Sequence, residues 1–315
     1  MQQTEAENRS WKSSLSELGG RLSFDAPLAG VTWFQVGGKA EVLYRPPNLQ
    51  ALQTALRLTP ARVAVTVIGV ASNLLIRDGG IDGLVIRLGR EFAAIEGDRE
   101  QNRLRLGASV LDLNAATYAS NSSLSGLEFL SGIPGTIGGA VKMNAGAYGR
   151  DMAAVLHSVA GVGRGGESQV LAADSLHLTY RHCDLPEGFI VTEALVKVEA
   201  GSASESLARI AEIKAAREAT QPIRSRTGGS SFKNPPPDSR TQGLKAGELI
   251  DAAGCRGLVK GGAQVSPLHC NFLINDGTAT ASEIEDLGEE VRQRVAAKFG
   301  VMLEWEIAII GKRQA

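Results

Sequence analysis

The stretch that decides the fold reads Gly132-Ile133-Pro134-Gly135-Thr136-Ile137-Gly138-Gly139-Ala140-Val141-Lys142-Met143-Asn144-Ala145-Gly146-Ala147-Tyr148-Gly149, with six glycines in eighteen residues. Glycine lacks a Cβ atom, so peptide N–H groups can approach a ligand closely, as they do around a phosphate. A flexible linker would be polar, whereas this stretch carries Ile133, Ile137, Val141 and Met143, side chains that need burial. We therefore interpret 132–149 as a cradle for a phosphate group or a cofactor.

Two further glycine clusters lie upstream, at 36–40 and 68–80. Three separate clusters favour a long, extended cofactor, although 36–40 alone fits a hairpin turn equally well. No Gly-x-Gly-x-x-Gly motif opens a helix after a strand, and no Gly-x-x-x-x-Gly-Lys-Ser/Thr motif occurs. The sequence therefore argues against dinucleotide-binding and P-loop sites of the familiar kinds.

The composition is that of an ordinary globular protein, with 315 residues, 43% hydrophobic and 21% charged, enough for two or three domains. A net charge of −1 gives no broad basic surface, so neither nucleic acid nor an anionic membrane is expected as a partner. The first twenty residues are polar, and no run of about 18 uncharged apolar residues occurs, which predicts a cytoplasmic protein without membrane insertion. Three cysteines without C-x-x-C spacing indicate free thiols, and four scattered histidines predict no metal site.

Hydrophobic periodicity predicts a mixed α+β chain. The polar residues 1–24 are expected to form an arm or a short helix. A helix is predicted over 48–58, and Ser109 with Asp112 could cap another that runs towards residue 120. Short strands are predicted at 41–45, 63–68 and 84–87.

The C-terminal half is predicted to begin after a linking helix. That charged helix covers 204–219, and the boundary between two halves is placed near residue 200. A later helix is predicted to start with a capping box formed by Ser282 and Glu285 and to end before Gly300. A strand over 303–309 should follow, with its apolar side chains on one face and its glutamates on the other.

Two polar segments could carry chemistry. Arg181, after Tyr180, is either a fixed cation for an anionic substrate or an ordinary surface arginine. The segment 228–235 presents a hydroxyl, a cation and an amide within five residues, behind two glycines. It fits a loop for anion binding or proton donation, and it also fits a polar turn; the three side chains are those of Ser230, Lys233 and Asn234.

A third polar segment covers 261–275. It is expected to emerge from a turn as a strand with His269, Asn271 and Asn275 on one face. A lone histidine without a carboxylate neighbour in sequence is more often structural than catalytic. We therefore leave His269 out of the predicted catalytic set.

Taken in order, these segments resemble the UDP-N-acetylenolpyruvoylglucosamine reductase family, flavoenzymes of peptidoglycan synthesis. The resemblance runs from about Val31 to Gly311, and the ordered set is far more specific than any single motif. The short span between Gly149 and Tyr180 resembles the shorter of the family's two subtypes. The matching motifs are Trp33-Phe34-Gln35-Val36-Gly37-Gly38, Ala71-Ser72-Asn73-Leu74-Leu75, 132–149, Tyr180-Arg181, 229–235, 246–275 and Glu304-Trp305-Glu306.

The resemblance implies an α+β fold with an FAD-binding module of two subdomains, similar to the vanillyl-alcohol-oxidase type, over 25–200. A smaller α+β substrate-binding domain would span 201–315, after the arm at 1–24. NADPH, the implied reductant, has no fingerprint of its own because members bind NADPH and substrate in turn at one site. The implied FAD contacts are Gly37, Gly38, Gly69, Ser72, Asn73, Gly132, Gly135, Thr136, Gly138, Gly139, Asn144 and Gly146.

The implied reaction passes a hydride from NADPH to FAD, and then from the flavin to the methylene carbon of UDP-N-acetylglucosamine enolpyruvate. Negative charge builds up on the adjacent carbon and on the carboxylate, where a cation and a proton donor lower the barrier. By resemblance, Arg181 is the cation, Ser230 the proton donor and Glu306 the carboxyl partner of Arg181. Glu304 shares a strand face with Glu306 and is the alternative; Glu306 is chosen because an aliphatic strand residue follows it, as in the family. A monomer is expected. The implied contacts to the UDP-sugar are Lys233, Asn234 and Asn271.

Two positions depart from the family pattern. Ala71 stands where members usually have glycine, and Cys183 where serine often follows Tyr-Arg. Two competing interpretations remain at this point. A flavin oxidase on the same FAD-binding module would be reoxidised by oxygen, and in a non-catalytic FAD- or nucleotide-binding protein Ser230 and Glu306 would have no chemical role.

Overall fold

The computed structural model describes residues 11–98, 101–238, 240–241 and 243–314. The chain divides into two compact units, each with its own hydrophobic core. The described part of unit 1 comprises 11–25, Glu41–Gly69 and Gly83–Ala215. That of unit 2 comprises Ala26–Ala40, Val70–Asp82 and the residues from Ala216 to 314.

The units cut the chain differently from the predicted domains. Two segments of the N-terminal half belong to unit 2, and the later change of unit falls at Ala216, within helix α5 (Ala203–Thr220). The predicted helix over 204–219 is confirmed. The division into an arm, an FAD-binding module and a substrate-binding domain stays a prediction, because a compact unit is not by itself a binding domain. Residues 1–10 of the predicted arm lie outside the described residues, whereas 11–16 are helical.

The first sheet, most of which belongs to unit 1, has the order β1-β2-β5-β3. Helix α2 (Leu49–Leu58) covers it by burying Leu52 and Leu56 in one core with Tyr44, and the Asn48 side chain caps the helix by accepting the Ala51 N–H. The predicted helix is confirmed, and the predicted strands are present with shifted ends. The strands are β1 (Arg21–Pro27), β2 (Lys39–Arg45), β3 (Val65–Val67) and β5 (Ile81–Ile86).

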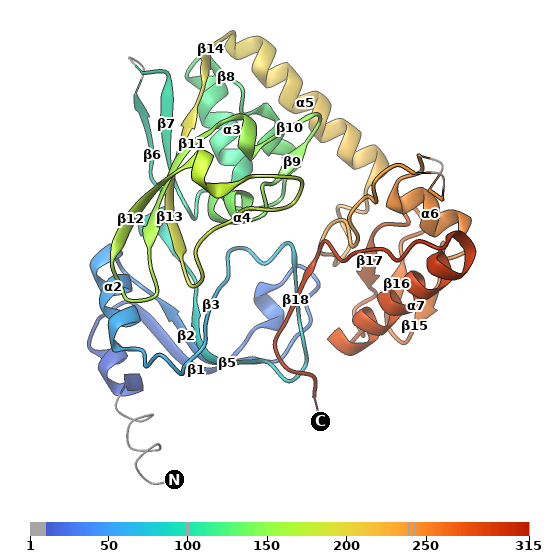
Figure 1. Ribbon diagram of the computed structural model, residues 1–315, viewed down its shortest axis with the longest axis horizontal. Coiled ribbons are helices and arrows are strands. Elements are labelled where there is room, and N and C mark those ends of the chain that lie inside the picture. Colours follow the sequence, from blue (N-terminus) through green and yellow to red (C-terminus); the bar gives the residue numbers. More distant parts are fainter. Residues whose placement is uncertain (1–10, 99–100, 239, 242, 315) are drawn as a thin grey trace. The chain divides into compact units, whose positions relative to one another are not determined.

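The second sheet of unit 1 is antiparallel throughout, in the order β12-β11-β13-β7-β6. Helices α3 (Asp112–Asn121) and α4 (Ile137–Lys142) lie beside it (Figure 1) and share one core with it. The strands are β6 (Ile95–Asp98), β7 (Arg103–Gly107), β11 (Leu156–Val162), β12 (Ser168–Ala172) and β13 (Ile190–Lys197). Two short ladders complete the unit, formed by β8 (Leu124–Ser125) with β14 (Glu199–Ala200) and by β9 (Gly146–Ala147) with β10 (Arg150–Asp151).

The predicted cap of α3 is wrong. Leu111 occupies the N-cap position, and no side chain caps the helix. The Ser109 hydroxyl donates to the carbonyl of Gly89 at 2.6 Å, and Asp112 is fully buried. The Ser109 hydroxyl is therefore used in a tertiary contact, and the buried Asp112 carboxyl group does not cap the helix.

Unit 2 is built from short strands around a long helix. Strands β15 (Val259–Lys260), β16 (Ala263–Val265) and β17 (Leu273–Asn275) form an antiparallel sheet, and β4 (Leu74–Ile76) pairs in parallel with β18 (Ala308–Ile310). Helices α6 (Ala246–Ala252) and α7 (Ala281–Phe299) pack with these strands (Figure 1). The predicted strand over 303–309 is therefore shorter, although Leu303 and Ile307 are buried and Glu304 is exposed, as its alternation predicts.

Helix α7 begins with a different capping box from the predicted one. The Thr280 hydroxyl accepts the Glu283 N–H at 3.1 Å, and the Glu283 carboxylate accepts the Thr280 N–H at 2.9 Å. Ser282 instead donates through its N–H and its hydroxyl to Asp78. Gly300, with φ of +66°, ends the helix as predicted.

Glu285 forms the main ion cluster that holds the segment 70–82 in unit 2. Its carboxylate accepts from Arg77 Nε at 2.8 Å and Nη2 at 2.9 Å, and from Arg313 Nη2 at 2.9 Å. The Glu285 side chain is only 6% exposed. Hydrogen bonds from Arg77 hold the pKa of Glu285 below its usual range despite this burial.

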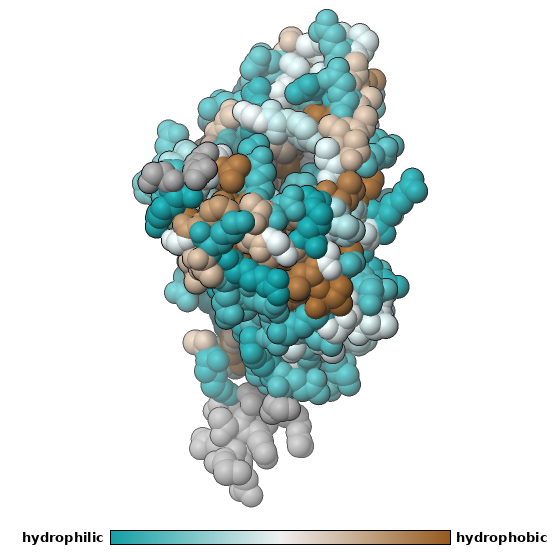
Figure 2. Space-filling model, turned by 90° about the vertical axis from the view of Figure 1, so that its right-hand side faces the viewer, coloured by the Kyte–Doolittle hydropathy of each residue, from teal (hydrophilic) through white to brown (hydrophobic). Residues whose placement is uncertain are grey.

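The surface is mostly hydrophilic on the side shown in Figure 2, where hydrophobic side chains form several separate patches. Large hydrophobic residues exposed in the C-terminal part of unit 2 include Ile223, Val259, Leu268 and Met302. Within the described ranges, no helix has both the length and the apolar character needed to cross a membrane.

Replacing Glu285 with Gln should lower the free energy of unfolding by about 3 kcal/mol, because two guanidinium groups lose their carboxylate. The folded-state pKa of Glu285 is lowered, so its contribution is present above the unfolded pKa and is lost as pH falls through the folded pKa. Urea unfolding of both proteins at about pH 7 and about pH 3 should show the difference shrinking in acid. An equal difference at both pH values would contradict this account.

Candidate functional site

In unit 2, the segment after Ser230 pairs with the segment that carries Glu306. The Glu306 N–H donates to the carbonyl of Ser231 at 2.9 Å. Phe232 and Trp305 form an isolated antiparallel bridge between the two segments, and their rings lie 4.7 Å apart. The pairing brings the predicted proton donor and the predicted carboxyl group onto adjoining segments.

The structure distinguishes the two adjacent serines. Ser231 is fully buried, its N–H donates to the carbonyl of Asn271 at 2.8 Å, and its hydroxyl oxygen accepts the Leu273 N–H at 3.2 Å. Ser230 is partly exposed. The Ser231 hydroxyl is committed to the fold, which favours Ser230 as the hydroxyl that can meet a ligand.

Asn271 holds this loop from behind. Its side-chain Nδ2 donates to the carbonyl of Phe232 at 2.9 Å, and its Oδ1 accepts the Phe232 N–H at 3.0 Å. The residue is 4% exposed. The amide therefore positions the loop. Because Asn271 is almost fully buried, the structure gives little support to its predicted contact with the substrate.

Lys233 and Asn234, the other predicted substrate contacts, follow on the same segment. Lys233 Nζ lies 3.3 Å from the Glu304 carboxylate, and its N–H donates to the Glu304 carbonyl at 2.9 Å. Asn234 Oδ1 accepts the N–H of Ala246 at the start of α6. An anionic ligand at Lys233 would therefore compete with the exposed carboxylate of Glu304.

The predicted strand through His269 is wrong in its first half. Residues 269–271 form a turn, in which His269 Nδ1 accepts the Asn271 N–H at 3.2 Å, and β17 begins only at Leu273. The His269 ring packs edge-on against Phe272, and burial lowers the pKa of its imidazole. Asn275 is also structural, since its Nδ2 donates to the carbonyl of Phe34. These contacts agree with leaving His269 out of the catalytic set.

A predicted cofactor residue contacts the backbone of Glu306. Asn73 Nδ2 donates to the Glu306 carbonyl at 3.0 Å, and the Asn73 carbonyl accepts the N–H of Ala308 at 3.0 Å. Ser72 is partly exposed beside it. Ala71 has φ of +53°, a left-handed conformation that favours glycine, so the glycine expected here from the family pattern would suit this turn.

In unit 1, Arg181 lies at the tip of a tight hairpin. Thr179 and His182 form the bridge that closes the hairpin, and Arg181 has φ of +56°. Arg181 Nη2 donates to the carbonyl of Gly146 at 3.1 Å, and its guanidinium lies 5.0 Å from the Tyr180 ring centroid. These contacts fix the guanidinium, which favours the fixed cation over the ordinary surface arginine.

Asn144 links the glycine-rich stretch to that hairpin. It is 1% exposed; its Nδ2 donates to the Thr179 carbonyl and its Oδ1 accepts the Ala153 N–H, both at 2.8 Å. Cys183, next to the hairpin, is buried, and burial raises the pKa of its thiol. A buried thiol of this kind is inert, so we interpret Cys183 as a packing residue.

Comparisons with known proteins bear on the whole chain. Residues 221–310 match the C-terminal domain of UDP-N-acetylenolpyruvoylglucosamine reductase, and 40–171 match an FAD-binding domain. Over 300 residues the chain is 55% identical to the UDP-N-acetylenolpyruvoylglucosamine reductase of Parvibaculum lavamentivorans, which covers 95% of this chain and 94% of the relative. The chain belongs to the UDP-N-acetylenolpyruvoylglucosamine reductase family.

Two further members of this reductase family extend the comparison. The reductase of Paramagnetospirillum magneticum is 51% identical over 311 residues, 99% of each chain. The crystal structure of the reductase from Thermus caldophilus superposes with a TM-score of 0.78 at 35% identity, over 92% of this chain and 98% of that one. The α+β fold class with an FAD-binding module and a C-terminal domain is confirmed, and the protein is an FAD-containing oxidoreductase.

Most glycines assigned to FAD have a structural reason within the protein. At seven of the eight, an added Cβ atom would lie within 3.1 Å of another residue of the same unit. Gly139 is the exception: it is exposed, and its Cβ would meet only the Thr136 hydroxyl, at 3.8 Å. Gly139 thus has open space beside it, which is compatible with its predicted contact to FAD. The glycines with a close neighbour are Gly37, Gly38, Gly69, Gly132, Gly135, Gly138 and Gly146.

Asp112 lies buried beside the glycine-rich stretch, a feature that the sequence analysis missed. Neither of its carboxyl oxygens has a hydrogen-bond partner among the described residues. A Cβ atom on Gly135 would lie 2.5 Å from Asp112 Oδ2, so glycine is needed there. Burial raises the pKa of Asp112 well above its usual range, which favours the neutral acid. An aspartate in the first turn of a helix signals a cap, and nothing local in the sequence indicates burial.

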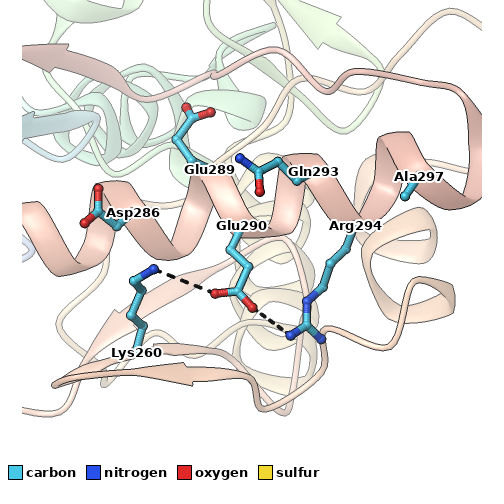
Figure 3. Close-up of a pocket in the computed structure, with 7 residues that line it drawn as sticks. All are labelled: Lys260, Asp286, Glu289, Glu290, Gln293, Arg294 and Ala297. Atoms are coloured by element: carbon cyan, nitrogen blue, oxygen red, sulfur yellow. Dashed lines mark hydrogen bonds and ion pairs between the residues drawn. The ribbon is translucent and has the colours of Figure 1, made fainter.

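An open depression of about 620 Å³ lies along α7, and Lys260 of β15 is among the residues that line it (Figure 3). Charged side chains line it, and Glu290 there pairs with Lys260 and Arg294. None of the predicted site residues lines this depression. Its position gives no support to a binding role in the reductase reaction.

Two alanine substitutions should separate packing from cofactor binding. Gly139→Ala should leave the apoprotein as stable or more so by about 0.5 to 1 kcal/mol, since alanine favours helix, yet weaken FAD binding by about tenfold. Gly138→Ala, whose Cβ would press on Ala108 at 3.1 Å, should lower the melting temperature of the apoprotein. Thermal melts and FAD titration of the apoproteins measure both effects. Unchanged FAD affinity in Gly139→Ala would remove this residue from the cofactor site.

Replacing Asp112 with Asn should change how stability depends on pH. The folded-state pKa of Asp112 is raised, so its contribution is fully present below the unfolded pKa of about 3.9 and is lost as pH rises through the folded pKa. Asn does not titrate, so the variant should gain stability relative to the parent as the pH rises above about 4, the unfolded pKa of aspartate. Melting temperatures of the apoproteins over this rise in pH test it, and parallel curves would show that Asp112 is not perturbed.

Proposed function

We propose that this protein reduces UDP-N-acetylglucosamine enolpyruvate to UDP-N-acetylmuramate with electrons from NADPH. Family membership supports an FAD-dependent reduction in peptidoglycan synthesis. One observation carries the assignment of roles within unit 2, namely the backbone pairing of 231–233 with 304–306. This pairing holds Ser230 and Glu306 on adjoining segments.

Ser230 is the proposed proton donor. When bound, FAD would supply a hydride to the methylene carbon of the enolpyruvyl group, where a C–H bond forms. The electron pair of the C=C bond then resides on the adjacent carbon and its carboxylate, and Ser230 transfers its hydroxyl proton to that carbon. The carbanion is far more basic than a serine alkoxide, so the transfer is downhill. The partial exposure of Ser230 supports this role over Ser231.

Glu306 and Arg181 are the proposed electrostatic partners of the developing charge. Each is held by contacts within its own unit, Glu306 through backbone hydrogen bonds and Arg181 through Gly146 and Tyr180. Such preorganised groups need little rearrangement when charge develops, which is why they lower the barrier. The held guanidinium supports the assignment of Arg181, and the held backbone of Glu306 supports its place on the segment that adjoins Ser230.

Substrate capture is assigned to the segment after Ser230. Lys233 is the proposed cation for the diphosphate of the UDP-sugar, and binding of the diphosphate would break the ion pair between Lys233 and Glu304. Asn234 and Asn271 are proposed to shape the site, Asn271 through its hold on Phe232. We further propose that the protein works in the cytoplasm as a monomer.

Anaerobic stopped-flow absorbance at about 450 nm tests the proposed reaction. NADPH should bleach the flavin, and UDP-N-acetylglucosamine enolpyruvate should then restore its absorbance. A flavin that bleaches but is restored only by oxygen would indicate an oxidase. A protein that retains FAD without responding to either compound would indicate a binding protein, and the proposal would be wrong.

Ser230→Ala should slow flavin reoxidation by the enolpyruvyl substrate by about 100-fold, because the carbanion loses its proton donor. Flavin reduction by NADPH and the melting temperature should stay near those of the parent. Ser231→Ala is the matched control: it leaves the buried Leu273 N–H without an acceptor, at a cost of about 1 to 3 kcal/mol, and should lower the melting temperature. Reoxidation at the parental rate in Ser230→Ala would exclude this serine as the donor.

A further inference from the structure

Trp305 sits between helix α7 and the loop that carries Ser230. A Cβ atom on Gly288 of α7 would lie 2.0 Å from Trp305 Cη2, so the indole rests directly on the helix backbone. Its other neighbour is Phe232, whose ring centroid is 4.7 Å away at an interplanar angle of 37°. The indole therefore lies between α7 and Phe232 and contacts both.

Glu289, the next residue along α7, fixes the edge of that indole. Trp305 Nε1 donates to Glu289 Oε1 at 2.8 Å. Arg292 Nη1 donates to Glu289 Oε1 at 2.8 Å and to Oε2 at 2.6 Å, while Arg292 Nε donates to the carbonyl of Leu303 at 2.7 Å. The carboxylate thus joins α7 to the segment 303–305 by charge-assisted hydrogen bonds, which are stronger than neutral ones.

The contacts run without a break from Glu289 to the proposed catalytic residues. Glu289 holds the Trp305 ring, and the Trp305 backbone bridges to Phe232. The residues on either side of that bridge are Ser231, whose carbonyl accepts the Glu306 N–H, and Glu306 itself. A rotation of the indole would therefore shift Glu306 and the Ser230 loop together.

We propose that Glu289 is a positioning residue for the protonation half of the reaction, acting through Trp305 on the spacing between Ser230 and Glu306. The inference rests on the proposed roles of those two residues. A displacement of about 1 Å at reacting groups can cost up to about 100-fold in rate, so a role for Glu289 should be measurable although it lies outside the paired segments.

Glu290 provides a matched control on the same helix. Figure 3 shows that Glu289 projects from a different side of α7 than Glu290, whose carboxylate pairs with Lys260 and Arg294. The two side chains are similarly exposed, at 38% and 32%. They differ in that only Glu289 is bonded to Trp305 among the described contacts.

The test compares Glu289→Leu, Glu289→Gln and Glu290→Leu in the holoenzyme by anaerobic stopped flow. Glu289→Leu should slow flavin reoxidation by the enolpyruvyl substrate by about tenfold, and leave flavin reduction by NADPH within about twofold of the parent. Glu289→Gln keeps an acceptor for the indole N–H and should restore most of the rate. Glu290→Leu should match the parent in both half-reactions.

A double-mutant cycle tests whether Trp305 transmits the effect. Trp305→Phe keeps a ring on Gly288 but loses the N–H donor, so it should reproduce the loss seen in Glu289→Leu. The two changes together should be no worse than either alone, because both break one interaction. Additive losses, or equal losses in both half-reactions together with a lower FAD content, would show a general structural effect and overturn the proposal.

Ser230→Ala and Glu306→Gln, measured alongside, separate this inference from the function on which it rests. If those variants react like the parent, the proposed catalytic roles are wrong. If they are slow while Glu289→Leu reacts at the parental rate, the proposed roles stand and the positioning role of Glu289 is wrong.

Discussion

The backbone pairing of residues 231–233 with 304–306 is the constraint on which the rest of unit 2 depends. Side chains alternate along an extended segment, so a shift of one residue in this register would bury Ser230 and expose Ser231. Asn271 fixes one segment by gripping Phe232, and the parallel pairing of β4 with β18 fixes the continuation of the other. The chemistry assigned to one hydroxyl thus depends on a few backbone hydrogen bonds and two aromatic rings.

Local patterns in the sequence predicted what local forces determine. The helices at 48–58 and 204–219 follow from apolar spacing and end signals, and the ordered motifs identified the family. The start of α7 shows the limit of this approach, because Thr280 with Glu283 and Ser282 with Glu285 satisfy the same capping rule. Tertiary contacts decide between them, since the Ser282 hydroxyl donates to Asp78 and the Glu285 carboxylate accepts from Arg77.

The glycine-rich segments illustrate the same limit for the site. Their composition predicted a cofactor cradle, and the family includes an FAD-binding domain, yet most of these glycines are also required by the packing of the chain on itself. Gly135, for example, makes room for Asp112, a buried acid that resembles a helix cap in the sequence. Burial and close approach arise from distant residues, so composition alone could not separate glycines that face a ligand from glycines that face the protein.

The origin of unit 2 from widely separated segments has a consequence for biosynthesis. Phe34, Val36 and Leu75 share one core with residues that follow Phe232, and β4 finds its parallel partner only in β18. During translation these early apolar residues emerge long before the residues that bury them, which lengthens the time in which they are open to aggregation. The buried core residues of unit 1 end at Val198, so this unit can condense earlier, and the nascent chain is expected to depend most on chaperones while the last third is being made.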